Sequence, residues 1–157
     1  MYTDLHCHLL YGIDDGAQTS ADALAMAKAL VSLGFSAVAP SPHALPQYPG
    51  PDVVDARRGE LQALLDAEGV ALKLHAGAEN WFDGDFLERE LTGKGRHING
   101  TAWVLVELPY EAPVPALPEM LFRLRRKGVR PVIAHPERCM EFERKGRAEE
   151  AVRTGAS

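Results

Sequence analysis

Histidines and acidic residues recur at the ends of apolar runs in this 157-residue sequence. In His6-Cys7-His8 the two histidines are two residues apart, so on a strand they would face one way while Cys7 faces the other. Mixed imidazole and carboxylate groups suit Zn, Mn or Fe rather than Ca. The residues therefore predict a metal centre. Its candidate ligands are His6, His8, Asp15, His43, Glu79, Glu107 and His135.

Such a centre favours the hydrolysis of a phosphate ester. Carboxylates such as Glu79 and Glu107 can bridge two ions, and neighbouring ions activate water and stabilise the attacking and leaving oxygens. Arg138 follows His135 by three residues. Its planar guanidinium could clamp phosphate oxygens, the alternative being an ion pair with a nearby carboxylate.

The elements that must position these residues alternate regularly along the chain. Apolar runs predict strands at residues 2–6, 35–39, 70–76, 101–108 and 130–134. Periodic patterns predict helices at residues 20–33, 52–68, 83–91, 118–128 and 141–154. Alternating strands and helices indicate parallel pairing and an α/β architecture. Each run leads to a candidate ligand at its carboxyl end, the face where such folds build their sites.

Individual residues predict one helix start and the exposure of several polar side chains. Thr19 and Asp22 have the spacing of a capping box at the start of the first helix. The acidic residues of the last predicted helix, Glu141 among them, are expected to face solvent. His97 lies in a polar, glycine-containing stretch and is also expected to be exposed.

Composition excludes several classes of protein. The formal net charge is −5 and no basic stripe is present, which argues against nucleic-acid binding. No run is long enough for a membrane span, and the start does not resemble a signal peptide, so a cytoplasmic location without membrane insertion is expected. The two cysteines, Cys7 and Cys139, make no disulfide framework. A cysteine nucleophile is rejected, because Glu141 and Glu143 between Cys139 and Arg144 would repel phosphate and raise the thiol pKa.

Five sequence elements resemble one known superfamily. Asp4-Leu5-His6-Cys7-His8 with Gly12-Ile13-Asp14-Asp15-Gly16 resembles the opening of the polymerase-and-histidinol-phosphatase (PHP) superfamily. The further elements Ser41-Pro42-His43, Gly77-Ala78-Glu79, Glu107 and Ala134-His135-Pro136-Glu137-Arg138 resemble its CpsB/YwqE-like bacterial protein-tyrosine phosphatases. Members of that branch act on tyrosine kinases that control capsule and exopolysaccharide synthesis. The resemblance runs from residue 1 to about residue 140.

The resemblance implies a distorted (β/α)7 TIM-like barrel that holds two to three divalent metal ions. Mn is the expected metal, with Fe, Zn or Co as alternatives. Arg138 would contact the substrate phosphate. Carried over by position, one ion falls to His6, His8 and Glu79, a second to Glu79, Glu107 and His135, and a third to Asp15 and His43.

Two departures qualify the resemblance. Histidinol phosphatases more usually have histidines at the positions of Asp15 and Glu107, which favours the tyrosine phosphatase branch. The family also continues into strands with an Asp-x-His element that completes the first and third ions, and nothing after Arg138 supplies it. We therefore expect a single, C-terminally truncated domain over residues 1–157 with about five βα units. Open strand edges would permit a homo-oligomer.

The predicted function is a metal-dependent phosphomonoesterase that dephosphorylates phosphotyrosine on proteins, with a bacterial tyrosine autokinase as the expected partner. One alternative is a PHP-type small-molecule phosphatase such as histidinol-phosphatase. The other is an inactive metal-binding fragment, since the activity of this chain without the Asp-x-His element is open.

Overall fold

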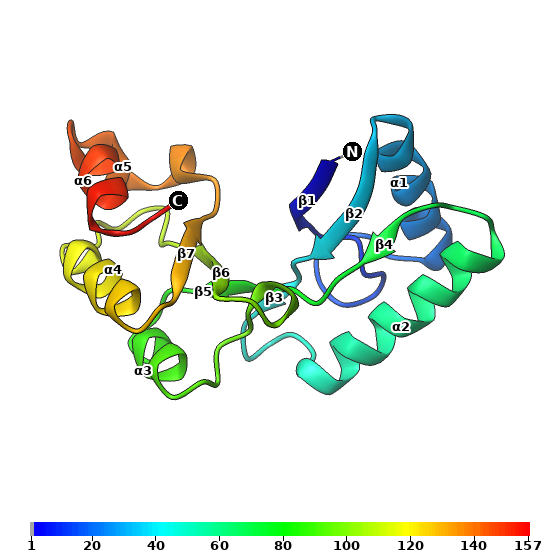
Figure 1. Ribbon diagram of the computed structural model, residues 1–157, viewed down its shortest axis with the longest axis horizontal. Helices are drawn as coiled ribbons and strands as arrows, with labels where there is room; N and C mark the ends of the chain where they lie inside the picture. The colour runs from blue at the N-terminus through cyan, green and yellow to red at the C-terminus, as the bar shows by residue number, and fades with distance from the viewer. Residues whose placement is uncertain (1) are drawn as a thin grey trace. The chain divides into compact units, whose positions relative to one another are not determined.

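The computed structural model describes residues 2–157, which form an α/β fold of parallel strands and helices. The chain divides into two compact units, Met1–Ala78 and Glu79–Ser157, and each is described by itself (Figure 1). The single domain over residues 1–157 stays a prediction. Within residues 2–157, no helix has the length and apolar character that crossing a membrane requires.

The first unit is built on a parallel sheet in the order β1-β2-β4. In the pairing of β1 with β2, Tyr2 lies opposite Phe35 and Cys7 lies opposite Pro40. Helices α1 and α2 pack beside this sheet (Figure 1). The elements of this unit are β1 Tyr2–Cys7, α1 Ser20–Ser32, β2 Phe35–Pro40, β3 His43–Ala44, α2 Pro51–Ala67 and β4 Lys73–Leu74.

The capping box predicted before α1 is present. The Thr19 hydroxyl accepts from the Asp22 backbone N–H at 3.2 Å, and the Thr19 N–H donates to the Asp22 carboxylate at 2.9 Å. Two donors at the helix start are thereby satisfied. The α1 residues Ala23 and Ala27 and the α2 residue Leu61 are fully buried in the core of this unit.

The third predicted strand is shorter than its apolar run, since β4 covers only Lys73–Leu74. Gln62 of α2 explains part of this difference. Its side-chain oxygen accepts from the Leu74 N–H at 2.8 Å, and its side-chain nitrogen donates to the Leu72 carbonyl at 3.2 Å. The Gln62 side chain therefore forms hydrogen bonds with backbone groups that would pair with a neighbouring strand if β4 were longer.

The second unit contains three parallel strands, with β6 paired to β5 on one side and to β7 on the other. Its core includes Phe86, Val104, Leu108, Leu121 and Leu124, all fully buried. The elements are β5 Glu79–Trp81, α3 Phe86–Leu91, the 3-10 turn η1 Ile98–Gly100, β6 Trp103–Glu107, α4 Leu117–Arg126, β7 Arg130–Ile133, the 3-10 turn η2 Pro136–Arg138, α5 Met140–Glu143 and α6 Arg147–Thr154.

The predicted final helix is wrong as one element, because the chain breaks between α5 and α6 at Gly146, where φ is +85°. Glu141 does not face solvent as expected; it is 0% exposed. Its carboxylate accepts from the Val114 N–H at 2.6 Å and pairs with the Arg147 guanidinium. The buried acid thus joins α5, α6 and the loop before α4.

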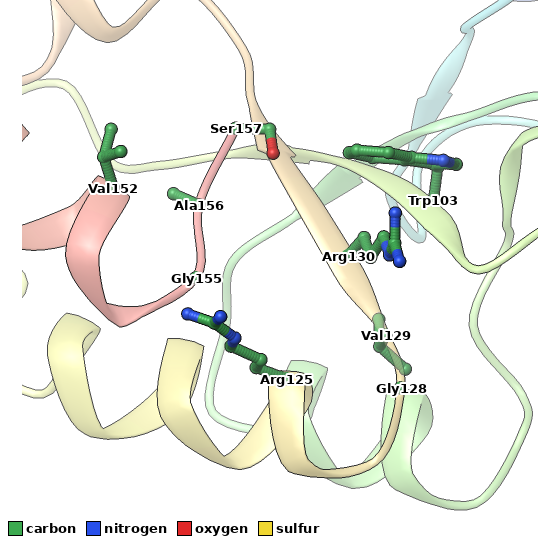
Figure 2. Close-up of a pocket in the computed structure, with 9 residues that line it drawn as sticks. All are labelled: Trp103, Arg125, Gly128, Val129, Arg130, Val152, Gly155, Ala156 and Ser157. Carbon is green, nitrogen blue, oxygen red and sulfur yellow. The ribbon is translucent and has the colours of Figure 1, made fainter.

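A cavity of about 480 Å³ lies at the amino-terminal ends of β6 and β7 (Figure 2). Trp103 and Arg130 line it, with the guanidinium of Arg130 5.3 Å from the centre of the Trp103 ring. Ser157 also lines it and pairs with β7, donating to the Pro131 carbonyl and accepting from the Ile133 N–H. Glu107 ends β6 at its other end, so this cavity is separate from the candidate ligands of the second unit.

Candidate metal centre

In the first unit, the end of β1 gathers three of the predicted ligands. Two hydrogen bonds join Cys7, the last residue of β1, to Ser41, the first residue after β2. The Cys7 N–H donates to the Ser41 hydroxyl, and the Ser41 N–H donates to the Cys7 carbonyl, both at 2.9 Å. The ring centres of His6 and His8 are 5.6 Å apart, and those of His8 and His43 are 4.7 Å apart. Cys7 packs against the core instead, which confirms that it faces away from the two histidines.

The loop after His8 requires a glycine at position 16, the last residue of the Asp14-Asp15-Gly16 element. A Cβ on Gly16 would lie 2.1 Å from the His8 carbonyl oxygen and 2.4 Å from its Cβ, so no larger residue fits without moving the loop. The Ala17 N–H donates to the same His8 carbonyl at 3.1 Å. This close approach folds the loop back onto His8 and brings the two aspartates beside the histidines.

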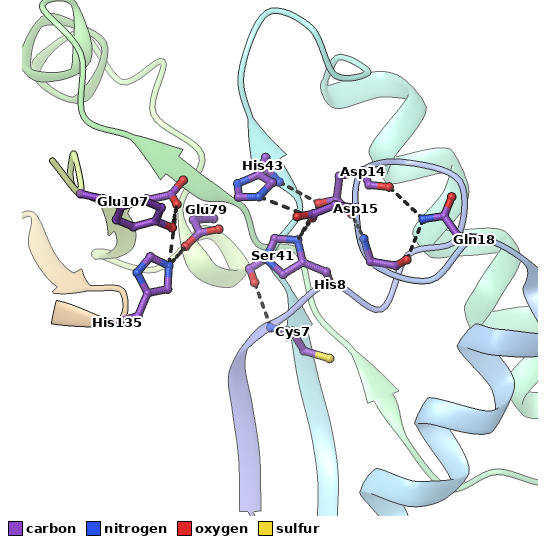
Figure 3. A network of polar contacts seen from close by, with 12 residues as sticks. Cys7, His8, Asp14, Asp15, Gln18, Ser41, His43, Glu79, Glu107 and His135 are labelled. Carbon is purple, nitrogen blue, oxygen red and sulfur yellow. Dashed lines mark hydrogen bonds and ion pairs between the residues drawn. The ribbon is translucent and has the colours of Figure 1, made fainter. Parts of the chain in front are cut away.

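Asp14, which the sequence analysis did not select, makes the closest of these contacts (Figure 3). Its Oδ2 lies 2.7 Å from His8 Nδ1 and accepts from the His43 backbone N–H at 3.0 Å, while its side chain is 1% exposed. Burial alone would raise the pKa of Asp14, but hydrogen bonds from His8, Gly16 and His43 outweigh it and lower the pKa. Asp14 is therefore an ionised anchor for both histidines.

Asp15, the predicted ligand, lies further out. Its side chain is 69% exposed, and its Oδ1 is 3.6 Å from His8 Nδ1 and 3.5 Å from His43 Nε2. His8, Asp14 and Asp15 each offer a ligand atom within 4.8 Å of the others. The first unit thus brings His6, His8, Asp15 and His43 together; their roles as ligands stay predictions.

In the second unit, Glu79 begins β5, Glu107 ends β6 and His135 follows the end of β7, and these three strands are neighbours (Figure 3). Glu79 does not simply follow the third strand but begins an additional strand, β5. His135 Nε2 lies 2.9 Å from Glu79 Oε1 and 3.8 Å from Glu107 Oε1. Both carboxylates are buried, at 1% and 3% exposure. Carboxylates held this deeply are paired or bind metal ions.

His135 reaches this position through an unusual backbone conformation, with φ of +27°. A non-glycine residue in this region is strained, and such residues concentrate at functional sites. The turn holds it in place, because the His135 carbonyl accepts from the Arg138 N–H at 2.9 Å and from the Cys139 thiol at 3.8 Å. The same turn places Arg138 three residues further on, in an exposed position.

Tyr110 is a second residue that sequence reasoning missed. Its hydroxyl donates to Glu107 Oε1, and its ring meets the His135 ring edge-on with centres 5.5 Å apart. Burial and the Glu107 carboxylate raise the pKa of Tyr110 to about 12, against an opposing effect of Arg138. No motif marks this tyrosine in the sequence; its distance of three residues from Glu107 was the available signal.

Cys139 has none of the properties of a nucleophile. It is 2% exposed, and burial, together with the charges of Glu107 and Glu137, raises the pKa of its thiol. A reactive cysteine needs a lowered pKa and access. The geometry therefore agrees with the rejection of a cysteine-based mechanism.

His97 lies apart from both clusters and is not exposed as expected. Its Nδ1 donates to the Thr101 carbonyl at 2.8 Å, and its Nε2 lies 2.8 Å from the carboxylate of buried Glu90. The pair holds the loop before β6 against α3. It is a structural contact that the polar sequence around His97 did not reveal.

The donor chemistry of both clusters fits divalent metal ions. Imidazole nitrogens and carboxylate oxygens form the set favoured by Mn, Fe and Zn. In the first unit a buried carboxylate contacts His8 Nδ1, the arrangement in which the second ring nitrogen of a histidine ligand is usually held. In the second unit two buried carboxylates flank one imidazole.

Comparisons with known proteins agree with this chemistry. The chain is 37% identical over 149 residues to the tyrosine-protein phosphatase YwqE of Bacillus subtilis, an alignment that covers 88% of the chain and 56% of that protein. It is 26% identical over 137 residues to the putative tyrosine-protein phosphatase CapC of Staphylococcus aureus, covering 86% of the chain and 54% of the relative. The chain thus spans little more than half the length of these relatives.

The fold of the chain is similar to that of a solved structure. That structure is one of the crystal structures of YwqE from Bacillus subtilis and CpsB from Streptococcus pneumoniae, which are described as metal-dependent tyrosine phosphatases. The match has a TM-score of 0.90 and 32% identity and covers 99% of this chain and 64% of the other. The expected PHP-type α/β fold with parallel sheets is confirmed for the part of it that the chain covers. Residues 2–157 match the family model for capsular polysaccharide synthesis, CpsB/CapC, and the chain therefore belongs to the CpsB/CapC family.

Proposed function

We propose that this chain serves the metal-dependent hydrolysis of phosphotyrosine on proteins. The observation that carries the proposal is the cluster of Glu79, Glu107 and His135, with two buried carboxylates beside one imidazole at adjacent parallel strands. Family membership supports it, because relatives are named tyrosine phosphatases and a similar solved structure is described as metal-dependent.

The proposed reaction needs metal ligands and a residue that binds the phosphate. The ligands would be the seven named from the sequence, with Mn as the proposed metal and two to three ions in all. Bound ions supply Lewis-acid stabilisation of the phosphoryl oxygens and activate water. Arg138, exposed three residues after His135, would hold phosphate oxygens through its planar guanidinium.

The proposed substrate is a phosphotyrosine protein, namely a bacterial tyrosine autokinase that controls capsule or exopolysaccharide synthesis. The family description names capsular polysaccharide synthesis, which supports this assignment. A phosphoprotein must approach an open surface, and Arg138 and Tyr110 are both exposed enough to meet it.

The test is release of phosphate from a phosphotyrosine peptide by this chain in Mn²⁺, with EDTA as the metal-free control. We expect Mn²⁺-dependent turnover, a loss of at least about tenfold in Arg138→Ala, and near-complete loss in Glu107→Gln. Histidinol phosphate and a phosphoserine peptide serve as competing substrates. Faster turnover of histidinol phosphate would select the small-molecule alternative, and Mn²⁺ binding with no turnover of any substrate would contradict catalysis by this chain.

A further inference from the structure

Tyr110 contacts two of the predicted metal ligands within the second unit. Its hydroxyl donates to Glu107 Oε1, and its ring packs edge-on against His135. The nearby Arg138 guanidinium lowers the pKa of the Tyr110 hydroxyl, against the larger effects of burial and the Glu107 carboxylate that raise it. One residue therefore contacts two predicted metal ligands.

The backbone of Tyr110 is fixed as firmly as its hydroxyl. The Tyr110 carbonyl accepts from the Met140 N–H at 2.9 Å, which ties the loop after β6 to the residue that begins α5. The turn that carries His135 and Arg138 lies directly before Met140. Tyr110 and this turn are thus held together by backbone and side-chain contacts.

From this geometry we propose that Tyr110 is a positioning residue of the metal centre, whose hydroxyl fixes the Glu107 carboxylate in the orientation that binds the ion. The inference rests on the ligand assignments of the proposed function. A carboxylate has two oxygens and several acceptor positions, so a donor on one side restricts its rotation and leaves the remaining positions for a metal. Hydrogen-bond partners of metal ligands commonly change metal affinity by about 10–100-fold.

The competing explanation is that Tyr110 only packs. Tyr110 is 39% exposed, so most of the residue is buried, and both this burial and the ring contact with His135 would survive loss of the hydroxyl. Tyr110→Phe separates the two explanations because it removes the hydroxyl and keeps the ring. Tyr11→Phe is the matched control: the Tyr11 hydroxyl also donates to a carboxylate, that of Glu60 at 3.1 Å, but on an exposed surface of the first unit.

The experiment is a calorimetric titration of the metal-free chain with Mn²⁺, applied to the unaltered chain and both variants. A titration of Glu107→Gln shows which Mn²⁺ site involves Glu107, because this variant weakens Mn²⁺ binding at that site. The affinity of that site is then compared among the proteins. We expect Tyr110→Phe to weaken that site by about 10–100-fold and Tyr11→Phe to leave it unchanged. With Co²⁺ as a second probe, the visible absorption spectrum should change in Tyr110→Phe, a readout that packing alone would not move.

Each outcome has a distinct meaning. Unchanged or tighter Mn²⁺ binding in Tyr110→Phe, or an equal loss in Tyr11→Phe, would overturn the positioning role. Failure of the unaltered chain to bind Mn²⁺ would overturn the metal centre and the positioning role together. If Tyr110→Phe weakens Mn²⁺ binding but phosphotyrosine peptide is not hydrolysed, the proposed reaction fails and the role of Tyr110 stands.

Discussion

Asp14 shows at the scale of a single residue how a buried carboxylate can prepare a histidine for a metal. It faces His8 Nδ1 at 2.7 Å and accepts the His43 N–H at 3.0 Å. An acceptor at Nδ1 selects the tautomer with the proton there, so that the lone pair lies on Nε2, which is the form in which a histidine binds a metal ion. The aspartate thereby sets both the orientation and the chemical form of the ring.

We therefore predict that Asp14→Asn weakens Mn²⁺ binding by about 10–100-fold, because an amide is a weaker acceptor and can flip its donor toward the ring. Calorimetric titration of the metal-free variant measures the change. Asp55→Asn is the matched control, since exposed Asp55 pairs only with Arg58 of α2 in the contacts described. Equal affinity in Asp14→Asn and the unaltered chain would refute the role of Asp14.

Sequence spacing identified the histidines but could not separate Asp14 from Asp15. The two acids are adjacent and chemically equivalent, and only the loop closed by Gly16 buries one and exposes the other. Tyr110 escaped prediction for a similar reason. Its partner Glu107 is close in sequence, but the contact depends on how the loop after β6 is tied to Met140.

At the scale of elements, the start of α1 depends on reciprocal bonds between Thr19 and Asp22. The Thr19 hydroxyl and N–H both contact the Asp22 carboxylate, and these bonds lower the pKa of Asp22. A carboxylate with a lowered folded-state pKa stabilises the fold above its unfolded pKa of about 3.9, and that contribution is lost as pH falls through the folded pKa.

Thr19→Ala should accordingly lower the free energy of unfolding by about 1 kcal/mol at pH 7. The difference from the unaltered chain should shrink as the pH falls below about 4, because Asp22 then becomes protonated in both proteins. Urea unfolding followed by circular dichroism at each pH measures it, with Thr19→Ser as the control that keeps the hydroxyl. A difference that does not vary with pH would contradict the contribution of Asp22.

Elements with strong local signals were predicted well, and those set by distant contacts were not. Apolar runs and capping residues located β1, β2, β6 and the start of α1 to within a few residues. The break between α5 and α6 depends on Glu141, whose partner Val114 is 27 residues away. An acidic residue in a charged stretch indicates a solvated helix unless that partner is known.

At the scale of the whole molecule, the α/β class and the family could be predicted because the ligand motifs follow successive strands in order. The division into two compact units, Met1–Ala78 and Glu79–Ser157, could not be predicted, since no linker-like change of composition marks residues 78 and 79.

The charge of the chain indicates how a bound metal ion would change its stability. The chain carries a formal net charge of −5, and Glu79 and Glu107 are acids taken out of water.

Binding of Mn²⁺ should therefore stabilise the folded chain as a whole. An ion that binds only the folded state adds stability that grows with its concentration, by about 2.7 kcal/mol at one hundred times the dissociation constant. We expect the midpoint of thermal unfolding to rise steadily with Mn²⁺ and to return to its starting value in EDTA. The rise should be much smaller in Glu107→Gln, since that change removes one ligand charge from the cluster around His135. A rise of the same size in Glu107→Gln would show that Mn²⁺ acts on the exposed acidic surface, because buried ligands would then contribute nothing to the binding that stabilises the fold.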